Sequence, residues 1–325
     1  MSTVDLHVIF GAGPVGSAVM QELVARGRRV RVVSRSGRLA APAGVEVLAG
    51  DVTNPESARA LCAGASVVYN CLNAPYTAWP EQFPPLQAGV LAGAAAAGAK
   101  LVVMENVYMY GPTGGRPLTE DLPYTATTRK GRTRARMAED LLAAHAAGTV
   151  RVAIGRASDF FGPGAIDSAA GERVFANAVA GKPAQTTGNP DMPHTYAYVP
   201  DIAKGLATLG EREEALGQAW HLPAAPAVTT RELVALAFEA AGHAPRLQAL
   251  PPWLVRGLGL AMPIMRELAE MLYEFEEPFV VDHGKFARAF GDHTTPLRQA
   301  IGATVAWYQE RARKAGGSNV SRLAR

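Results

Sequence analysis

Short apolar runs alternate with longer helical stretches through the first half of the chain. The runs expected to be buried strands are residues 6–10, 29–33, 45–48, 66–70, 100–104 and 150–154. The helices expected between them are residues 14–26, 55–61, 83–97 and 133–147. This alternation predicts an α/β protein with a Rossmann-type, doubly wound parallel sheet.

The second half of the chain loses this regular alternation after about residue 162. Helices are expected at residues 200–209, 229–241 and 295–313, separated by loops that contain proline. We therefore expect an NAD(P)-binding domain over residues 1–162. Residues 163–314 are expected to form mainly a smaller C-terminal substrate lobe, interleaved with the first domain, and residues 315–325 a flexible tail.

Composition and charge narrow the class of protein. The 325 residues are 48% hydrophobic and 19% charged, as in packed globular proteins. The net charge of +3 comes from local arginine clusters, which suit phosphate groups better than a nucleic-acid track. Two cysteines, no signal segment and no apolar run of about 18 residues predict a cytoplasmic protein without a membrane span. The expected partner is a small-molecule substrate and not nucleic acid, and a homodimer is left open.

The first chemical motif is a glycine turn between an apolar run and a helix. Gly11 permits a tight turn, Gly13 lets the backbone approach a pyrophosphate, and Gly16 lets the helix pack against the strand. Pro14 and Val15 begin the helix, whose free N–H groups favour an anion. An ordinary glycine turn is the alternative, but the strand before it and the helix after it favour dinucleotide binding.

The second expected strand ends in a basic turn, Ser34, Arg35 and Ser36. An NAD site usually has an acid there, which accepts hydrogen bonds from the ribose 2′-hydroxyl. A guanidinium cannot accept them, but it suits a 2′-phosphate, with Arg38 as a second cation. The sequence therefore predicts NADP rather than NAD, and an exposed basic turn is the alternative.

Five further segments follow in order: Asp51 and Val52, residues 67–73, Tyr110 and Gly111, residues 156–164, and residues 198–203. In this order the chain resembles the NAD(P)-dependent epimerase/dehydratase family, the extended short-chain dehydrogenase/reductases, over almost its whole length. Residues 156–164 are similar to that family's RPxNxYGPG segment. The resemblance implies that Asp51 and Val52 contact the adenine, and that the strand ending at Leu72 and Asn73 passes beneath the cofactor. The family's usual first turn would require glycine at Phe10.

The chain departs from this family at the chemistry. The family uses a tyrosine as general acid/base, a lysine four residues later and a Ser or Thr that polarises the substrate carbonyl. Aligning Met137 and Glu139 with the family's helix puts Gly131 at the tyrosine position and Ala135 at the lysine position. The Ser or Thr position is occupied by Asn106.

Three residues are the candidates for the missing chemistry. Asn106 can donate an amide hydrogen bond to a carbonyl oxygen, with loop structuring as the alternative. Tyr108 offers a titratable hydroxyl, with simple packing as the alternative. Lys130, together with Arg134, flanks the vacated positions and could supply positive charge beside the nicotinamide ribose or an anionic substrate. The alternative, a solvated helix start, suits Arg132 and Arg136 better.

Clues to the substrate are few. Tyr76 and Trp79 are expected to form an apolar wall, and His194, Tyr196 and Tyr198 to approach from the second lobe. The apolar stretch 251–265 could cover a hydrophobic substrate, the core or a dimer face, and covering the core is the default. Histidines do not group with carboxylates at metal spacing, so no catalytic metal is expected.

Two functions fit these observations. The first is an NAD(P)-dependent oxidoreductase or epimerase-like enzyme that acts on a small organic carbonyl or alcohol with a non-standard catalytic site. The second is a non-catalytic NADP(H)-binding sensor that regulates a protein partner. Both need the glycine turn and Arg35. The missing tyrosine and lysine favour the sensor, whereas Asn106 and the aromatic loop favour the enzyme.

Overall fold

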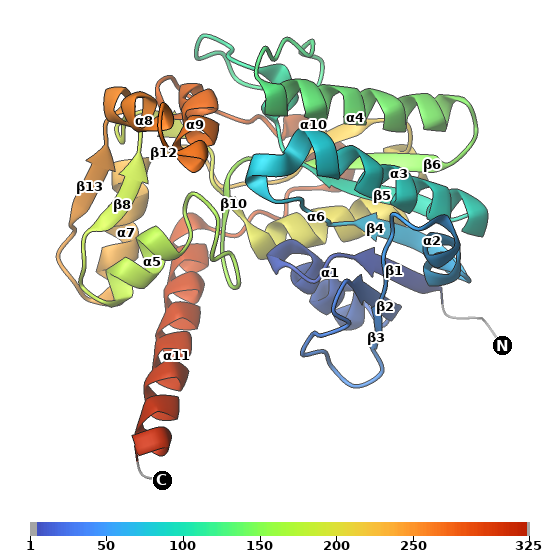
Figure 1. Ribbon diagram of the computed structural model, residues 1–325, viewed down its shortest axis with the longest axis horizontal. Helices are drawn as coiled ribbons and strands as arrows, with labels where there is room; N and C mark the ends of the chain where they lie inside the picture. The colour runs from blue at the N-terminus through green and yellow to red at the C-terminus, as the bar shows by residue number, and fades with distance from the viewer. Residues whose placement is uncertain (1–4, 324–325) are drawn as a thin grey trace.

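The computed structural model describes residues 5–323, with side chains to residue 315, and shows a parallel sheet with a smaller lobe beside it (Figure 1). Within these residues, seven strands form one sheet in the order β11-β6-β5-β4-β1-β2-β3. The strands are β1 (Leu6–Phe10), β2 (Arg29–Ser34), β3 (Glu46–Ala49), β4 (Ala65–Asn70), β5 (Lys100–Glu105), β6 (Arg151–Arg156) and β11 (Ala219–His221). All neighbours pair in parallel, so this is the Rossmann strand order with one strand added at the β6 edge.

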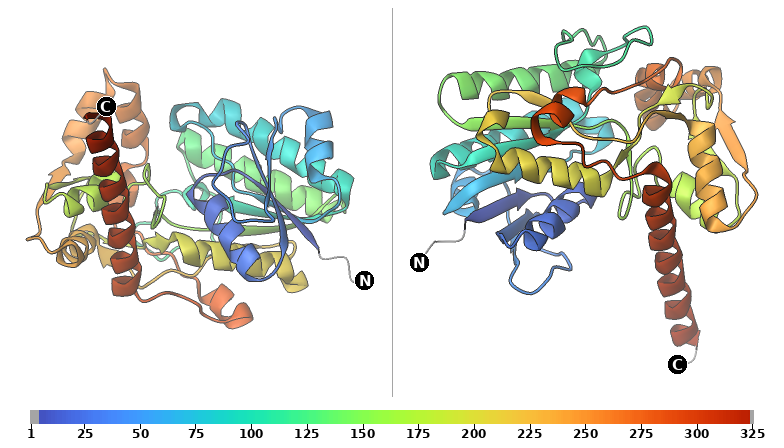
Figure 2. Two further views of the ribbon diagram at one scale, coloured as in Figure 1. Left: turned by 90° about the horizontal axis from the view of Figure 1, so that it is seen from below. Right: turned by 180° about the vertical axis from the view of Figure 1, so that it is seen from behind.

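Helices cover both faces of this sheet (Figure 2). One face carries α1 (Pro14–Ala25), α6 (Val199–Glu211) and α10 (Gly284–Phe290), and the other α2 (Pro55–Cys62), α3 (Trp79–Ala97) and α4 (Arg129–Ala146). Side chains alternate along a strand, so Val8 and Phe10 pack on the α2–α4 side and Ile9 on the α1–α6 side. Burial on both faces explains why these strands are apolar runs.

The second lobe is built from helices and short strand pairs. Its elements are α5 (Glu172–Val179), α7 (Thr230–Ala241), α8 (Pro252–Gly259), α9 (Pro263–Glu270), α11 (Leu297–Leu323), β7 (Phe160–Phe161), β8 (Ala184–Thr187), β9 (Pro193–His194), β10 (Ala197–Tyr198), β12 (Val228–Thr229) and β13 (Leu247–Leu250). Short 3-10 helices complete the chain: η1 (Tyr76–Ala78), η2 (Tyr108–Tyr110), η3 (Glu213–Ala215) and η4 (Leu272–Phe275). The lobe's own core contains Phe161, Phe175 and Phe238.

The six expected strands are present, and the seventh, β11, was missed because three residues give too little pattern. Helix α4 begins four residues earlier than expected, because Thr128 caps it by accepting a hydrogen bond from the backbone N–H of Gly131 at 3.1 Å. Where a loose tail was expected from residue 315, the backbone stays helical to Leu323. Residues 324–325 lie outside the described part.

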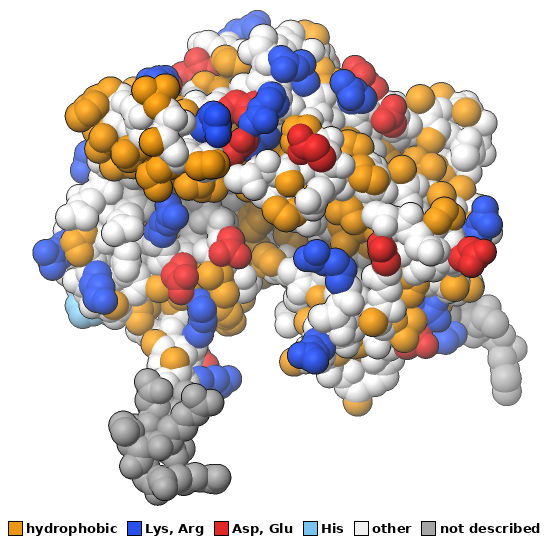
Figure 3. Space-filling model, in the orientation of Figure 1, with side chains coloured by type: hydrophobic (Ala, Val, Ile, Leu, Met, Phe, Trp, Pro, Cys, Tyr) orange, Lys and Arg blue, Asp and Glu red, His pale blue; other side chains and the backbone are white. Residues whose placement is uncertain are grey.

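The stretch 251–265 covers the core only in part, because Val255 is fully buried whereas four large apolar side chains of the stretch are exposed. Trp253 is 71% exposed, Leu260 91%, Met262 43% and Ile264 40%. Hydrophobic side chains gather over α8 and α9 on the outside of the second lobe (Figure 3). Despite this patch, no helix among the described residues has the length and apolar character needed to cross a membrane.

Candidate active site

In the turn after β1, two of the three glycines have no space for a side chain, whereas the third has space. A Cβ at Gly11, whose φ is +109°, would lie 2.5 Å from the carbonyl oxygen of Cys71. One at Gly16 would lie 2.0 Å from the carbonyl oxygen of Gly11. At Gly13, by contrast, no described atom beyond its chain neighbours lies within 4 Å of the Cβ position. This open backbone at the N-terminus of α1 fits a pyrophosphate group.

A cavity of about 340 Å³ adjoins this turn. Gly13, Pro14 and Ser17 line it from the sheet side, and Gly164 and Val199 line it from the segments that lead into the second lobe. Pro14 is the first residue of α1, and the side chain of the next residue, Val15, packs into the core. The helix start therefore lines the cavity with the open backbone of Gly13 and with Pro14 and Ser17, while Val15 points into the core.

The end of β2 presents a free cation. Ser34 accepts a hydrogen bond from the backbone N–H of Gly37 at 3.1 Å, which shapes the turn that follows. Arg35 is exposed, and its side chain makes no hydrogen bond or ion pair with the described residues. The β2 end lies beside the β1 end in register, because Phe10 pairs with Val33. The guanidinium is thus available near the glycine turn.

The other expected cofactor contacts follow β3 and β4. One Asp51 oxygen accepts hydrogen bonds from the hydroxyl (2.7 Å) and backbone N–H (2.9 Å) of Thr53, which lowers the pKa of Asp51. Val52 is buried, Leu72 is half-buried and Asn73 is exposed. Since β4 pairs with β1, the residues after β4 lie at the same sheet edge as the glycine turn.

The structure explains why the usual tyrosine is absent at position 131. A Cβ at Gly131 would lie 2.4 Å from the Cβ of Ala126 and 2.8 Å from the carbonyl oxygen of Tyr108. The loop before α4 fills the space that a tyrosine side chain would need. The donors of this site must therefore come from other positions.

Two side chains that carry hydrogen-bond donor groups follow β5. The Asn106 side-chain oxygen accepts a hydrogen bond from the Tyr108 backbone N–H at 3.3 Å, so its amide NH₂ remains available. The Tyr108 ring stacks on Trp79 with 5.8 Å between centroids, and its phenol interacts with that of Tyr76. Burial, followed by the nearby Glu274 carboxyl, raises the pKa of Tyr108 well above its usual value. The phenol stays protonated and can donate a hydrogen bond.

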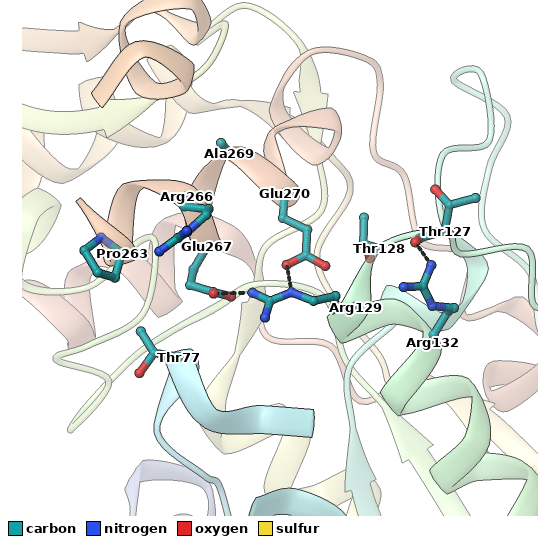
Figure 4. Close-up of a pocket in the computed structure, with 10 residues that line it drawn as sticks. All are labelled: Thr77, Thr127, Thr128, Arg129, Arg132, Pro263, Arg266, Glu267, Ala269 and Glu270. Carbon is teal, nitrogen blue, oxygen red and sulfur yellow. Dashed lines mark hydrogen bonds and ion pairs between the residues drawn. The ribbon is translucent and has the colours of Figure 1, made fainter. Parts of the chain in front are cut away.

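Lys130 is not a free charge. Its ammonium group is buried, pairs with Glu267 and with Glu270 at 3.2 Å, and lies 4.4 Å from the centre of the Tyr76 ring. The neighbouring Arg129 also pairs with Glu267. The Arg129 pairs with Glu267 and Glu270 join the start of α4 to α9 at one side of a cavity of about 780 Å³ (Figure 4). Lys130 thus links the sheet domain to the second lobe.

The arginines that follow divide by burial. Arg134 is 5% exposed, and its guanidinium carbon lies 4.3 Å from the centre of the Phe83 ring and 5.1 Å from that of Trp79. Arg132 and Arg136 are exposed, as a solvated helix face requires. Arg134 is therefore packed in the interior, whereas Arg132 and Arg136 face the solvent.

The structure adds acidic groups that the sequence did not single out. Asp159 follows β6, and Glu274 lies in η4 of the second lobe. Both influence the ionisation of Tyr76 and Tyr108, so these acids lie beside the phenols at the carboxyl ends of β4 and β5. Burial and then the Asp159 charge raise the pKa of Glu274 well above its usual value.

Asp159 carried a signal in the sequence, because it stands at the Asn of the RPxNxYGPG pattern. Glu274 carried none, since it lies in an acidic stretch without periodicity. His194 does approach from the second lobe, and it hydrogen-bonds Asp159 at 3.1 Å. Tyr196 is buried beside it, with its hydroxyl 2.8 Å from that of Thr230.

Comparisons with known proteins agree with this architecture. The chain superimposes on the Mth375 epimerase of Methanothermobacter thermautotrophicus with a TM-score of 0.80 at 18% identity, covering 97% of this chain and 95% of that one. A double mutant of DesIV, a dTDP-glucose 4,6-dehydratase of Streptomyces venezuelae solved with NAD, gives 0.76 at 18% identity, covering 94% and 97%. WbmH of Bordetella bronchiseptica, in complex with NAD⁺, gives 0.73 at 18% identity, covering 95% and 99%. These likenesses show the fold.

The sequence itself gives the family. No curated protein matches it significantly. The model of the NAD dependent epimerase/dehydratase family matches residues 8–222, from β1 to just past β11. This match covers more than half of the chain and includes the glycine turn, Asn106 and Tyr108. The chain therefore belongs to the NAD dependent epimerase/dehydratase family, whose nicotinamide cofactor fits the open turn at Gly13.

Proposed function

We propose that this protein is an NADP(H)-dependent oxidoreductase that reduces a small organic carbonyl compound, or oxidises the matching alcohol, with a non-standard catalytic site. The observation that carries the proposal is the open turn at Gly13, at the same sheet edge as the donors Asn106 and Tyr108. Ligands of open α/β sheets bind outside the carboxyl ends of the strands, where these residues lie. When bound, the nicotinamide supplies the hydride chemistry.

The preference for NADP rests on Arg35. DesIV and WbmH have been solved with NAD, so the family fold accepts that cofactor. In this chain, the exposed and unpaired Arg35 follows β2, where an NAD site usually has an acid. A guanidinium donates hydrogen bonds to a 2′-phosphate, but it cannot accept the hydrogen bond that a ribose 2′-hydroxyl donates.

The residues at the β5 end would bind the substrate oxygen. Tyr108 stays protonated at neutral pH and donates through its hydroxyl, and Asn106 donates through its amide. Two donors aimed at a carbonyl oxygen stabilise the negative charge that develops there during reduction. Lys130, already paired with Glu267 and Glu270, holds α9 against the start of α4.

The test is a screen of small aldehydes, ketones and the corresponding alcohols with both nicotinamide cofactors. NADPH oxidation should follow addition of a carbonyl substrate, and NADH should be used less efficiently. A matched preparation of Arg35→Asp separates true turnover from contaminating reductases, because its cofactor preference should change with the same substrate.

A sensor function remains the rival proposal, and a specific observation favours it. The tyrosine and lysine positions hold Gly131 and Ala135, and no space remains for a tyrosine at 131. Tight NADPH binding without turnover across the whole screen would favour the sensor. A change in protease sensitivity of the second lobe on NADPH binding would then be its expected readout.

We also place the protein in the cytoplasm. Cys62 and Cys71 are both free thiols, and burial raises the pKa of each to about 12. Free thiols without a disulfide partner are usual in a reducing compartment, where disulfides are rare.

A further inference from the structure

His194 is held between two oxygen atoms. Its Nδ1 lies 3.1 Å from the backbone carbonyl oxygen of Glu274, and its Nε2 lies 3.1 Å from a carboxylate oxygen of Asp159. The ring is buried and is packed by Tyr196, Phe275 and Phe279, with centroids 4.6, 4.9 and 5.1 Å away. This packing holds the plane of the ring, and the two facing oxygen atoms assign its nitrogens, because a flipped ring would turn carbon atoms towards them.

These two contacts require one more proton than a neutral imidazole and a carboxylate contain. A backbone carbonyl only accepts hydrogen bonds, so Nδ1 must carry a hydrogen. Neutral imidazole then has no hydrogen on Nε2, and an ionised carboxylate has none to offer. The Nε2–Asp159 contact is a hydrogen bond only if one further proton resides on His194 or on Asp159.

His221 shows the contrasting arrangement in the same molecule. Its Nδ1 lies 2.9 Å from the backbone carbonyl oxygen of Asp282, as in His194, but its Nε2 lies 2.8 Å from the phenol oxygen of Tyr110. A phenol can donate, so His221 is satisfied as a neutral ring. Burial accordingly lowers the pKa of His221 to about 3. The extra proton is a property of the His194 site.

Asp159 is the member of this pair that a substrate can reach. Its side chain is 17% exposed, whereas that of His194 is 2% exposed. Only one of its oxygens is engaged in a hydrogen bond with the described residues. Its charge influences the ionisation of Tyr76, Tyr108 and Tyr273, which places it among the phenols at the carboxyl edge of the sheet.

Glu274 gives a second, independent sign that this space receives a ligand. Its side chain is 1% exposed and makes no hydrogen bond or ion pair with the rest of the described chain, and its Oε1 is fully buried. A buried polar oxygen without a partner is costly, unless another molecule satisfies it. It lies in η4, close to Asp159, Tyr76 and Tyr108.

We propose that Asp159 is the catalytic proton donor of this site, and that His194 is the positioning residue that holds the shared proton at the Asp159 carboxyl. The assignment rests on the proposed reduction of a carbonyl compound. The O–H bond of the Asp159 carboxyl breaks as its proton passes to the substrate oxygen, and the nicotinamide, when bound in its reduced form, would supply the hydride to the carbonyl carbon. This leaves a carboxylate beside a neutral imidazole, and one proton taken up from solvent through the more exposed Asp159 side chain restores the pair.

The deciding variant is Asp159→Asn, which keeps the shape of the side chain. The asparagine amide can donate to Nε2 of a neutral His194, so the pair stays bonded while the extra proton is lost. We expect turnover to fall by about 10²- to 10⁴-fold with the NADPH dissociation constant unchanged. Asp191→Asn, the same change at an exposed carboxylate paired with Arg231, is the matched control and should retain turnover.

The dependence of kcat/KM on pH tests whether Asp159 acts as the proton donor. Wild-type kcat/KM for carbonyl reduction should fall as the shared proton is lost at high pH, and Asp159→Asn should lack this descent. The other titratable groups around Asp159 are the carboxyl of Glu274 and the phenols of Tyr76, Tyr108, Tyr196 and Tyr273. They are unchanged in the variant. Full turnover in Asp159→Asn would overturn the proposal.

A measurement without substrate tests the proton itself. Nitrogen-15 NMR of the histidine rings in the unliganded protein should show hydrogen on Nδ1 of His194 and a proton shared at Nε2. Asp159→Asn should convert the ring to the neutral Nδ1–H form. A neutral ring with hydrogen on Nε2 alone would overturn the proposal. Absence of turnover in the wild-type protein would contradict the proposed function instead, so the two failures are distinguishable.

Discussion

Replacing Arg35 tests the cofactor preference most directly. The side chain is exposed and unpaired, so its substitution removes a charge without breaking an internal contact. Two unit charges 4 Å apart in water interact by about 1 kcal/mol, so a doubly charged 2′-phosphate gains about 2 kcal/mol from this cation. Arg35→Ala should therefore weaken NADPH binding by about 30-fold. Arg35→Asp adds repulsion of similar size, and should shift the NADPH-to-NADH affinity ratio by about 10³-fold in total.

Calorimetric titration with both cofactors at low and high salt measures this shift. NADH affinity should change little in Arg35→Ala, and the NADPH loss should shrink at high salt because exposed charges are screened. Arg59→Asp changes the charge of an exposed arginine on α2 equally and serves as the control. Equal affinity for NADPH and NADH in the wild-type protein, unaltered in Arg35→Asp, would refute the reasoning.

Three further predictions concern the turn, the phenol and a buried histidine. Gly13→Val should abolish NADPH binding in calorimetry while the melting temperature stays near that of wild type, because its Cβ position is open; unchanged affinity would contradict the assignment of the turn. Tyr108→Phe should lower kcat by about 10²-fold with NADPH affinity retained, and full turnover would exclude the phenol as a donor. Burial lowers the pKa of His7 from 6.5 to about 4 in the folded protein. As the pH falls from 6.5 towards 4, the unfolded state therefore binds a proton that the folded state does not bind, and the free energy of unfolding decreases. Urea unfolding should show a loss of about 2 kcal/mol from this group between pH 7 and 5, and His7→Gln should lack that part of the loss.

Local pattern predicted the elements that one stretch of sequence determines. The glycine turn and the strands before and after it could be predicted, because their residues are close together in the sequence and follow the pattern of a βα unit. The role of Arg35 could also be predicted, since its position at the end of a strand determines which part of a bound cofactor lies nearest to it. The three residues of β11 carried no such pattern, and only pairing with β6 makes them a strand.

The site depends on contacts between distant segments, which local pattern does not contain. Lys130 could be read as a free cation, yet its charge is balanced by Glu267 and Glu270 from far along the chain. Glu274 and Asp159 are far apart in the sequence, yet the Asp159 charge helps to raise the pKa of Glu274. Their shared environment, and with it the proton that we propose at His194, could not be inferred from spacing.

The pairing of β11 with β6 has a consequence for how the protein is made. The nascent chain completes β6 at Arg156 but does not supply its outer neighbour until His221 has left the ribosome. During that interval the edge of β6 offers unpaired backbone groups to other chains, the usual origin of aggregation of incomplete sheets. A fragment that ends at residue 162 would carry this edge permanently. The sheet domain therefore depends for its solubility on residues encoded within the second half of the gene.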